Sequence, residues 1–350
     1  MALTATPANI QYFFTQAQSR FWESYDVAPV FTDKLATTIP VKGEVWLEGF
    51  LTMVQKYREW QGPRVVQNPM PLTYQVPIKN WENTQAINKF RFDDDSYGIY
   101  APTFPFMGMQ AKKLSDYQIR DALLNQGVWT GSFQNCLDGL SMFNTAHPVN
   151  YWDASQGTFA NDYTAGGVTV NNQLIGGGIS TTAFATVWQD MSRRKTESGE
   201  AWGFSPNLAF EGPMLKVAVD TVLQAQFLAQ PQLVQLGTGS AGAVNGPMVG
   251  STQNVMAAGA GWATNLMIPE LSSSVAIGSG SNTYDQVWYL AYTDGPIKPI
   301  IWLLRQAPDF VARINPDDPV VFDKATYLYG SVARASMAWG FPSMLSRSGP

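Results

Sequence analysis

Residues 93–127 read DDDSYGIYAPTFPFMGMQAKKLSDYQIRDALLNQG, and the rest of the chain is organised around them. An acidic run and a proline-containing turn lead into the longest helix-permissive segment of the first half. This segment stops at Gly127, a residue type that commonly ends helices. We expect one helix from about Thr103 to Gln126. A shorter helix that starts at Ser115, which could form a capping box with Gln118, is the alternative.

The composition indicates a chain that hides surface against partners. Its 350 residues are enough for one large domain or two. The charged fraction is 14% and the aromatic fraction is 13%, whereas average proteins contain roughly 25% charged residues. Because soluble monomers rarely expose large apolar patches, we expect this chain to join copies of itself. The alternative is a large, weakly charged β-rich domain.

Charge, cysteine content and hydropathy exclude several classes of protein. The net charge is −5 and the longest basic cluster is Arg193-Arg194-Lys195, so nonspecific nucleic-acid binding is not expected as a main role. Cys136 is the single cysteine, which permits no intrachain disulfide and no cysteine-rich metal site. No apolar run reaches the roughly 18 residues of a membrane span. Residues 1–10 lack the pattern of a signal peptide, so we expect synthesis in the cytoplasm.

The N-terminal residues predict a helical arm. Thr6 and Pro7 read as an N-cap and a first helical residue. The helix should run from about Pro7 to Glu23, because apolar side chains recur at helical spacing at Ile10, Phe13, Phe14, Ala17 and Phe21. A linker with little periodicity follows over residues 25–41.

Residues 42–92 read as a long two-stranded excursion whose tip, at residues 57–71, is punctuated by glycine and proline. Apolar and polar residues alternate over 72–78, which predicts a half-buried strand. Residues 84–92 predict a second strand with Phe90 and Phe92 on one side. Since a lone two-stranded ribbon is marginal in water, it needs a surface to lie on, its own or a neighbour's.

The second half predicts helices and short strands between loops rich in glycine and serine. The loops cover residues 151–178, 235–261 and 272–281. Helical periodicity appears at residues 181–194, and a strongly apolar helix is expected at 214–229. Strands are expected at residues 208–210, 262–268, 287–292, 300–304, 309–314 and 326–338.

Chemistry-bearing residues form no convincing site. His147 is the single histidine and precedes a proline, so an imidazole bonded in a turn is expected rather than a general base. Asp93-Asp94-Asp95 could bind a hard cation, but acidic residues before a helix also favour its dipole. Asp317-Asp318 reads as a turn, and the glycine-rich residues 237–250 lack the lysine of a phosphate loop. We therefore predict no catalytic, cofactor-binding or metal residues, and no enzyme.

An ordered set of short motifs resembles the major head subunit of Mu-like tailed phages, the gpT family. The set spans most of the chain, is weaker in residues 151–178 and 231–283, and consists of Thr6-Pro-Ala-Asn-Ile10, Asp93-Asp94, Gly98-Ile-Tyr-Ala-Pro102, Phe143-x-x-x-His147-Pro-Val149, Ala307-Pro-Asp-Phe-Val311 and Tyr327-Leu-Tyr-Gly330 with Arg334.

The resemblance implies an α+β fold of the Hong Kong 97 capsid type. Its parts would be an N-terminal arm (1–41), an E-loop (42–92), a peripheral domain with a long spine helix (93–127), most of an axial domain (128–298) and return strands to the peripheral domain (299–350). Some relatives cross-link a lysine to an asparagine, but no motif here assigns that pair.

The function implied is structural. Copies would form pentamers and hexamers of an icosahedral head shell that encloses phage DNA without sequence-specific binding and without a membrane. The chain would be made in the bacterial host cytoplasm and end in the virion. A scaffold, a portal and decoration proteins are the implied partners. The alternatives are an encapsulin-like compartment shell and, in another class, a monomeric β-rich binding or hydrolytic domain.

Overall fold

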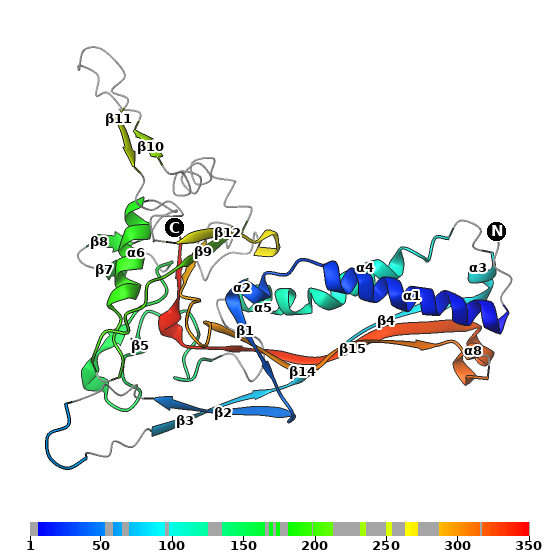
Figure 1. Cartoon of the computed structure of the whole chain (residues 1–350), viewed down its shortest axis with the longest axis horizontal. Helices are drawn as coiled ribbons and strands as arrows, with labels where there is room; N and C mark the ends of the chain where they lie inside the picture. The colour runs from blue at the N-terminus through cyan, green and yellow to red at the C-terminus, as the bar shows by residue number, and fades with distance from the viewer. Residues whose placement is uncertain are drawn as a thin grey trace.

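The computed structural model describes most of the chain, namely residues 6–52, 59–64, 70–94, 98–124, 135–164, 168–170, 173–175, 181–197, 199–212, 232–235, 250–253, 263–271, 287–315 and 317–349. Figure 1 shows an elongated body in which helices lie along one face of a long sheet, with a second sheet at one end. In the part of the chain that the structure describes, no helix is both long enough and apolar enough to cross a membrane.

The long sheet has the strand order β1-β14-β15-β4. Strand β1 (Ala36–Pro40) pairs in parallel with β14 (Ile300–Arg313), and β15 (Thr326–Trp339) pairs antiparallel with both β14 and β4 (Lys79–Asn88). The strands expected at 300–304, 309–314 and 326–338 are confirmed, the first two being one strand with register shifts between residues 304 and 309. Strands β14 and β15 thus return to strands of the first hundred residues.

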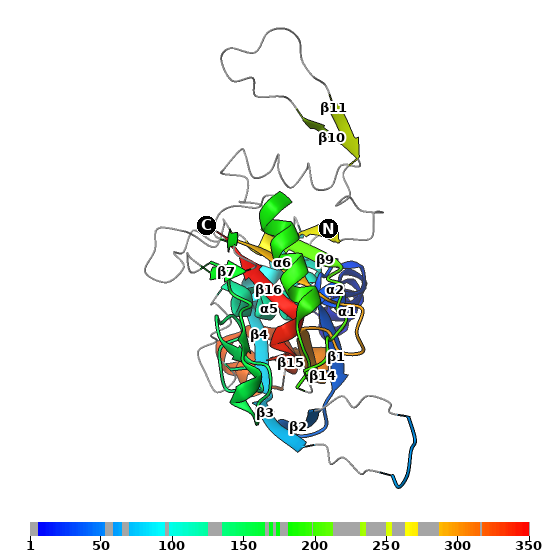
Figure 2. The same ribbon diagram turned by 90° about the vertical axis from the view of Figure 1, so that its left-hand side faces the viewer.

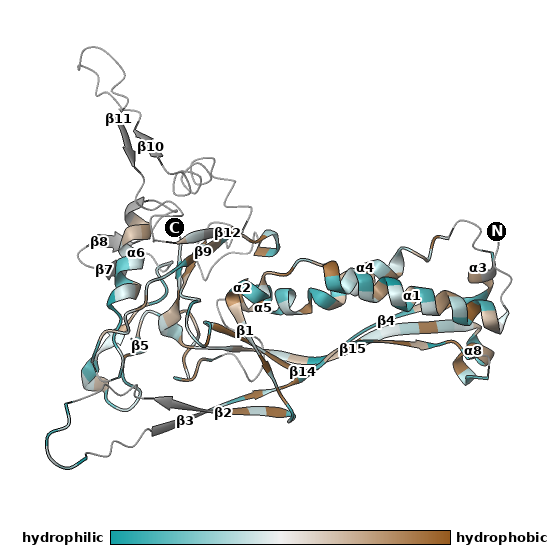
Figure 3. Cartoon of the chain, viewed as in Figure 1, coloured by the Kyte–Doolittle hydropathy of each residue, from teal (hydrophilic) through white to brown (hydrophobic). Residues whose placement is uncertain are grey.

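Helix α1 (Pro7–Val27) confirms the N-terminal helix and extends it by four residues beyond Glu23. Thr6 caps it by accepting a hydrogen bond from the Asn9 amide at 3.3 Å. Its expected apolar stripe is buried, apart from a half-buried Phe13, in a cluster that also contains residues of α4, β14 and β15. Figure 3 shows bands of hydrophobic and hydrophilic residues along α1 and hydrophobic positions along the sheet beneath it.

The expected single helix over 103–126 is two helices, α4 (Thr103–Lys112) and α5 (Leu114–Leu124), separated by Lys113. The alternative, a shorter helix that starts at Ser115, is close to the second of these, because α5 starts one residue earlier, at Leu114. Backbone hydrogen bonds continue across the break, since the Lys113 amide donates to Met109 O at 3.0 Å and the Tyr117 amide donates to Lys113 O at 3.0 Å. Residues 125 and 126 lie outside the described residues.

The two-stranded ribbon is shorter than the sequence suggests. Strands β2 (Val45–Thr52) and β3 (Met70–Pro77) pair antiparallel, whereas β4 leaves the ribbon and joins β15 in the long sheet. The strand expected to continue to Phe92 ends at Asn88. The Asn88 side chain accepts hydrogen bonds from the Phe90 and Arg91 amides and so caps the start of helix α3 (Lys89–Asp93). Consequently Phe92 is buried and Phe90 is exposed, rather than both lying on one side.

The second sheet has the order β12-β9-β13-β16. Its strands β12 (Thr264–Met267), β9 (Leu208–Glu211) and β13 (Trp288–Ala291) confirm three expected strands, and β16 (Leu345–Ser348) is the C-terminal one. Helix α6 (Thr181–Arg193) is also as expected, and Figure 2 shows it near this sheet. The helix expected at 214–229 lies outside the described residues.

Short elements complete the fold. The paired short strands are β5 (His147–Pro148) with β6 (Thr158–Phe159), β7 (Val168–Val170) with β8 (Gln173–Ile175), and β10 (Gln232–Gln235) with β11 (Gly250–Gln253). The short helices are α2 (Thr32–Leu35), α8 (Pro319–Lys324), η1 (Ala154–Gln156), η3 (Pro269–Leu271) and η5 (Pro342–Met344).

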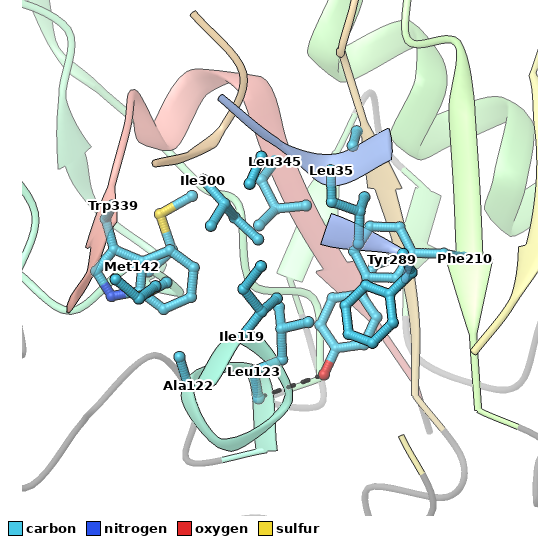
Figure 4. Packing of buried hydrophobic residues seen from close by; sticks show 14 of the residues in the cluster. Leu35, Ile119, Ala122, Leu123, Met142, Phe210, Tyr289, Ile300, Trp339 and Leu345 are labelled. Atoms are coloured by element: carbon cyan, nitrogen blue, oxygen red, sulfur yellow. Dashed lines mark hydrogen bonds between the residues drawn. The ribbon is translucent and has the colours of Figure 1, made fainter. Parts of the chain in front are cut away.

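One hydrophobic cluster joins the two sheets through α5 (Figure 4). Ile119 and Leu123 of α5 pack with Tyr289 of β13 and Trp339 of β15, and all four are at most 2% exposed. The Tyr289 hydroxyl also donates to the Leu123 carbonyl at 3.4 Å. Helix α5 is therefore the element that fixes the long sheet to the second sheet.

Candidate functional site

His147 is held as a structural residue. Its ring is 0% exposed, with Nδ1 at 2.5 Å from Asp138 Oδ2 and Nε2 at 3.1 Å from the Met142 carbonyl oxygen. The ring stacks on Phe159 at 5.4 Å between centroids. Both nitrogens thus face fixed partners inside the protein. The imidazole is hydrogen-bonded, as expected, although His147 begins strand β5 rather than lying in a turn.

The acidic runs sit at helix ends. Asp93 and Asp94 close helix α3, so they do not directly precede α4 as the dipole argument assumed, and Asp95 lies outside the described residues. Asp318 caps α8 by accepting from the Val320 amide at 2.9 Å and also pairs with Arg313. That backbone bond and then the guanidinium lower the pKa of Asp318. Among the described residues, no group of three or more His, Cys, Asp or Glu could hold a metal ion.

The basic cluster at the end of α6 has an interior role that the sequence did not indicate. Arg194 is 4% exposed and donates to the Ser343 carbonyl at 2.8 Å and to the Ser346 hydroxyl at 2.7 Å. A second buried arginine, Arg347 in β16, pairs with Asp162 at 2.5 Å. Because these donors fix the last strand to α6 and to residues near β6, the two arginines hold the C-terminus in the second sheet.

Large apolar side chains are exposed on many elements of the described surface. Thirteen of them are exposed in the described residues, with Phe322 at 81% and Val27 at 79%; the others are Tyr12, Val45, Leu47, Trp60, Phe90, Ile99, Phe106, Trp152, Met267, Val311 and Val332. They come from α1, α3, α4, α8, the ribbon and both sheets rather than from one patch. Because they are scattered rather than gathered in one patch, they do not by themselves mark an interface.

The ribbon is anchored on the body at one end and projects from it at the other (Figure 1). At the root, Trp46, Tyr74 and Val76 are buried in a cluster with Ile301 and Leu303 of the long sheet. Burial raises the pKa of the Tyr74 phenol well above its ordinary value. On the other face of the ribbon, Val45 and Leu47 are 48% and 61% exposed. One face of the ribbon is thus buried against its own chain, while the other face exposes apolar side chains.

The elements described above could be predicted from the sequence better than the contacts of their individual residues. Alternation over 72–78 identified the buried face of the ribbon. In contrast, Arg194, Arg347 and Lys113 gave no local signal, because their partners lie far away in the sequence.

The comparisons with known proteins agree with this architecture. A family model described as "Mu-like prophage major head subunit gpT" matches residues 10–174 and 269–349. The major capsid protein of Escherichia phage Mu is 31% identical over 147 residues, which cover 42% of this chain and 47% of that protein. The "Mu-like prophage FluMu major head subunit" of Haemophilus influenzae (strain ATCC 51907 / DSM 11121 / KW20 / Rd) is 26% identical over 145 residues, 41% of this chain and 45% of that protein. Each alignment thus spans less than half of the curated relative.

Solved structures show the fold. The procapsid of bacteriophage JBD30 matches with a TM-score of 0.51 at 21% identity, covering 99% of this chain and 76% of that chain. The capsid of the cyanophage P-SCSP1u also gives a TM-score of 0.51, at 11% identity, covering 91% of this chain and 88% of that one. These likenesses confirm the α+β fold of the Hong Kong 97 capsid type.

Proposed function

Since the chain belongs to the family of Mu-like prophage major head subunits, gpT, we propose that it is the major capsid protein of a tailed phage. Copies assemble as pentamers and hexamers into the icosahedral head that encloses the phage DNA. The observation that carries this proposal is the ribbon, whose root is buried in its own chain while Val45 and Leu47 on its other face are exposed.

The parts of the fold suggest how one subunit serves several neighbours. Residues 1–41 act as the N-terminal arm. The E-loop is the ribbon with its tip, residues 45–77. It is shorter than the expected 42–92 because β4 belongs to the long sheet. Residues 93–127 supply the spine, broken at Lys113, and the axial domain comes mostly from 128–298. Within residues 299–350, β14 and β15 return to the peripheral domain, whereas β16 lies in the second sheet. In a closed shell the same patches meet slightly different neighbours, and a projecting ribbon can absorb such differences.

The chemistry of the chain supports a structural role. The family is one of structural capsid proteins, and the histidine that could have served as a base is sealed in the interior. The net charge of −5 suits a lining that does not adhere to packed DNA. Scaffold, portal and decoration proteins are the partners of such a shell, which is made in the host cytoplasm and ends in the virion.

The experiment is assembly of the purified chain, with and without a co-expressed scaffold, followed by light scattering and negative-stain microscopy. Closed shells support the proposal, whereas a stable species of 38.5 kDa in both cases identifies a monomeric domain. Deletion of Met1–Ser24 removes the buried stripe of α1, so it should destabilise the subunit as well as impair assembly. Normal particles from that truncated chain would remove the assembly role of the arm.

A further inference from the structure

The ribbon tip presents a preorganised tryptophan. Trp60 is 70% exposed at the turn of residues 59–64, yet its indole N–H already donates to the Gly62 carbonyl at 2.7 Å. The Arg64 guanidinium lies over the ring at 4.9 Å from its centroid. Because the polar atom of the indole is satisfied within the tip, the ring can enter an apolar pocket without leaving an unpaired donor.

A groove of matching chemistry lies at the far end of α1, where this helix meets the start of α4. Its volume is about 540 Å³, larger than the cavities of about 140 and 190 Å³ between α4–α5 and the long sheet. The groove is lined by Val27, Ala28, Pro29, Pro105 and Met109, with Arg20, Glu23 and Ser24 beside them. A methionine and two prolines form a surface that suits a flat aromatic ring.

The charges around the two surfaces are complementary. The tip carries Glu59 and Arg64 on either side of Trp60, and the groove carries Arg20 and Glu23 on one helix. Glu23 can therefore meet the arginine that covers the indole, while Arg20 can meet Glu59. Val27, in the groove, is itself 79% exposed, so no part of the chain that the structure describes covers it.

We propose that Trp60 of one subunit docks in the α1–α4 groove of a second copy of the same chain. The inference rests on the proposed shell function and names one contact by which the projecting ribbon joins neighbours. Tryptophan and arginine are the residue types most enriched at interface hot spots. Trp60→Ala should weaken each contact roughly 30-fold, the effect of removing a hot-spot side chain, and Trp60→Phe should weaken it less.

Cysteine cross-linking tests the proposal directly, because the single native cysteine, Cys136, is buried. Gln61→Cys combined with Ser24→Cys, which leaves Trp60 and Met109 in place, should give covalent dimers and higher oligomers after mild oxidation of assembled particles. The matched control pairs Gln61→Cys with Phe322→Cys, whose position on α8 is 81% exposed but outside the groove, and should remain monomeric on denaturing gels.

A charge exchange provides the second measurement. Glu23→Arg and Arg64→Glu should each lower the yield of shells, and combining them should restore it. If wild-type shells form but the cysteine pair gives no oligomers, or only a bond within one chain, this contact is wrong and the shell function stands. If wild-type chains never associate, the contact and the proposed function both fail.

Discussion

Lys113 Nζ lies 2.8 Å from Glu270 Oε1, so the residue that separates α4 from α5 is tied to η3, beside the second sheet. The two side chains are 22% and 16% exposed, which leaves the pair partly open to water. The pair therefore links the helix break to the second sheet, while the hydrophobic cluster around α5 supplies the larger part of that connection.

Lys113→Met should cost about 1 kcal/mol or less of unfolding free energy at neutral pH, since partly exposed pairs contribute little. The hydrogen bond to Glu270 is the main cause that raises the pKa of Lys113. The stability that this hydrogen bond contributes is therefore complete below pH 10.5, the ordinary pKa of lysine. It is lost as the pH rises through the higher pKa that Lys113 has in the folded chain. Urea unfolding of wild type and variant should converge in that alkaline range. Lys42→Met, at an exposed position, is the control.

Asp116 of α5 holds the start of α2. Its carboxylate accepts from the Thr32 amide at 3.0 Å and the Thr32 hydroxyl at 2.6 Å, and it is 1% exposed. Asp116→Ala should cost roughly 2–3 kcal/mol or more, because it leaves buried donors without an acceptor. Denaturant unfolding measures this loss, and Asp121→Ala on the same helix is the partly exposed control. An unchanged midpoint would show that water replaces the carboxylate.

The same carboxyl gives a pH dependence of defined sign. Burial is the main cause that raises the pKa of Asp116 above 3.8, and the hydrogen bonds from Thr32 and Phe31 oppose it. Just above pH 3.8 the folded chain therefore keeps a proton that the unfolded chain has lost, so this group lowers stability as the pH rises through that window. Asp116→Asn should remove that component of the slope. Identical slopes for wild type and variant between pH 3.5 and a neutral value would contradict the assignment.

Several elements could be read from the sequence, and the reason some could not is distance along the chain. The helical stripe of α1 and the alternation at residues 72–78 are local patterns, and both are confirmed. The ion pair of Lys113 and the move of β4 into the long sheet involve Glu270 and β15, more than 150 residues away. The candidate site follows the same rule. The buried face of the ribbon could be predicted from its own alternation, whereas the residues of the long sheet that pack against it could not.

Gly108 lets α1 lie directly on α4. A Cβ at this position would be 2.2 Å from the Phe21 carbonyl oxygen, which is backbone and cannot swing away. In an exposed helix, a Gly-to-Ala change stabilises by about 1 kcal/mol, but Gly108→Ala should instead destabilise by roughly 1–3 kcal/mol through overpacking. Thermal unfolding should show a lower midpoint for Gly108→Ala and little change for the neighbouring exposed Gln110→Ala. A raised midpoint for Gly108→Ala would mean that α1 can move away from α4 without cost.

Arg347 and Asp162 are the most enclosed ion pair of the C-terminal strand, with Arg347 1% exposed and its guanidinium 4.6 Å from the centre of the Phe143 ring. Removing one partner leaves the other as an unpaired charge in the interior, so Arg347→Met should lower the free energy of unfolding by about 3–5 kcal/mol. The double variant with Asp162→Asn should recover part of that loss, because no unpaired charge then remains. A double-mutant cycle in denaturant, with Arg91→Met as an exposed control, measures the coupling. Additive losses would show that the two residues act independently, and the last strand would then owe its place to Arg194 and the packing of β13 alone.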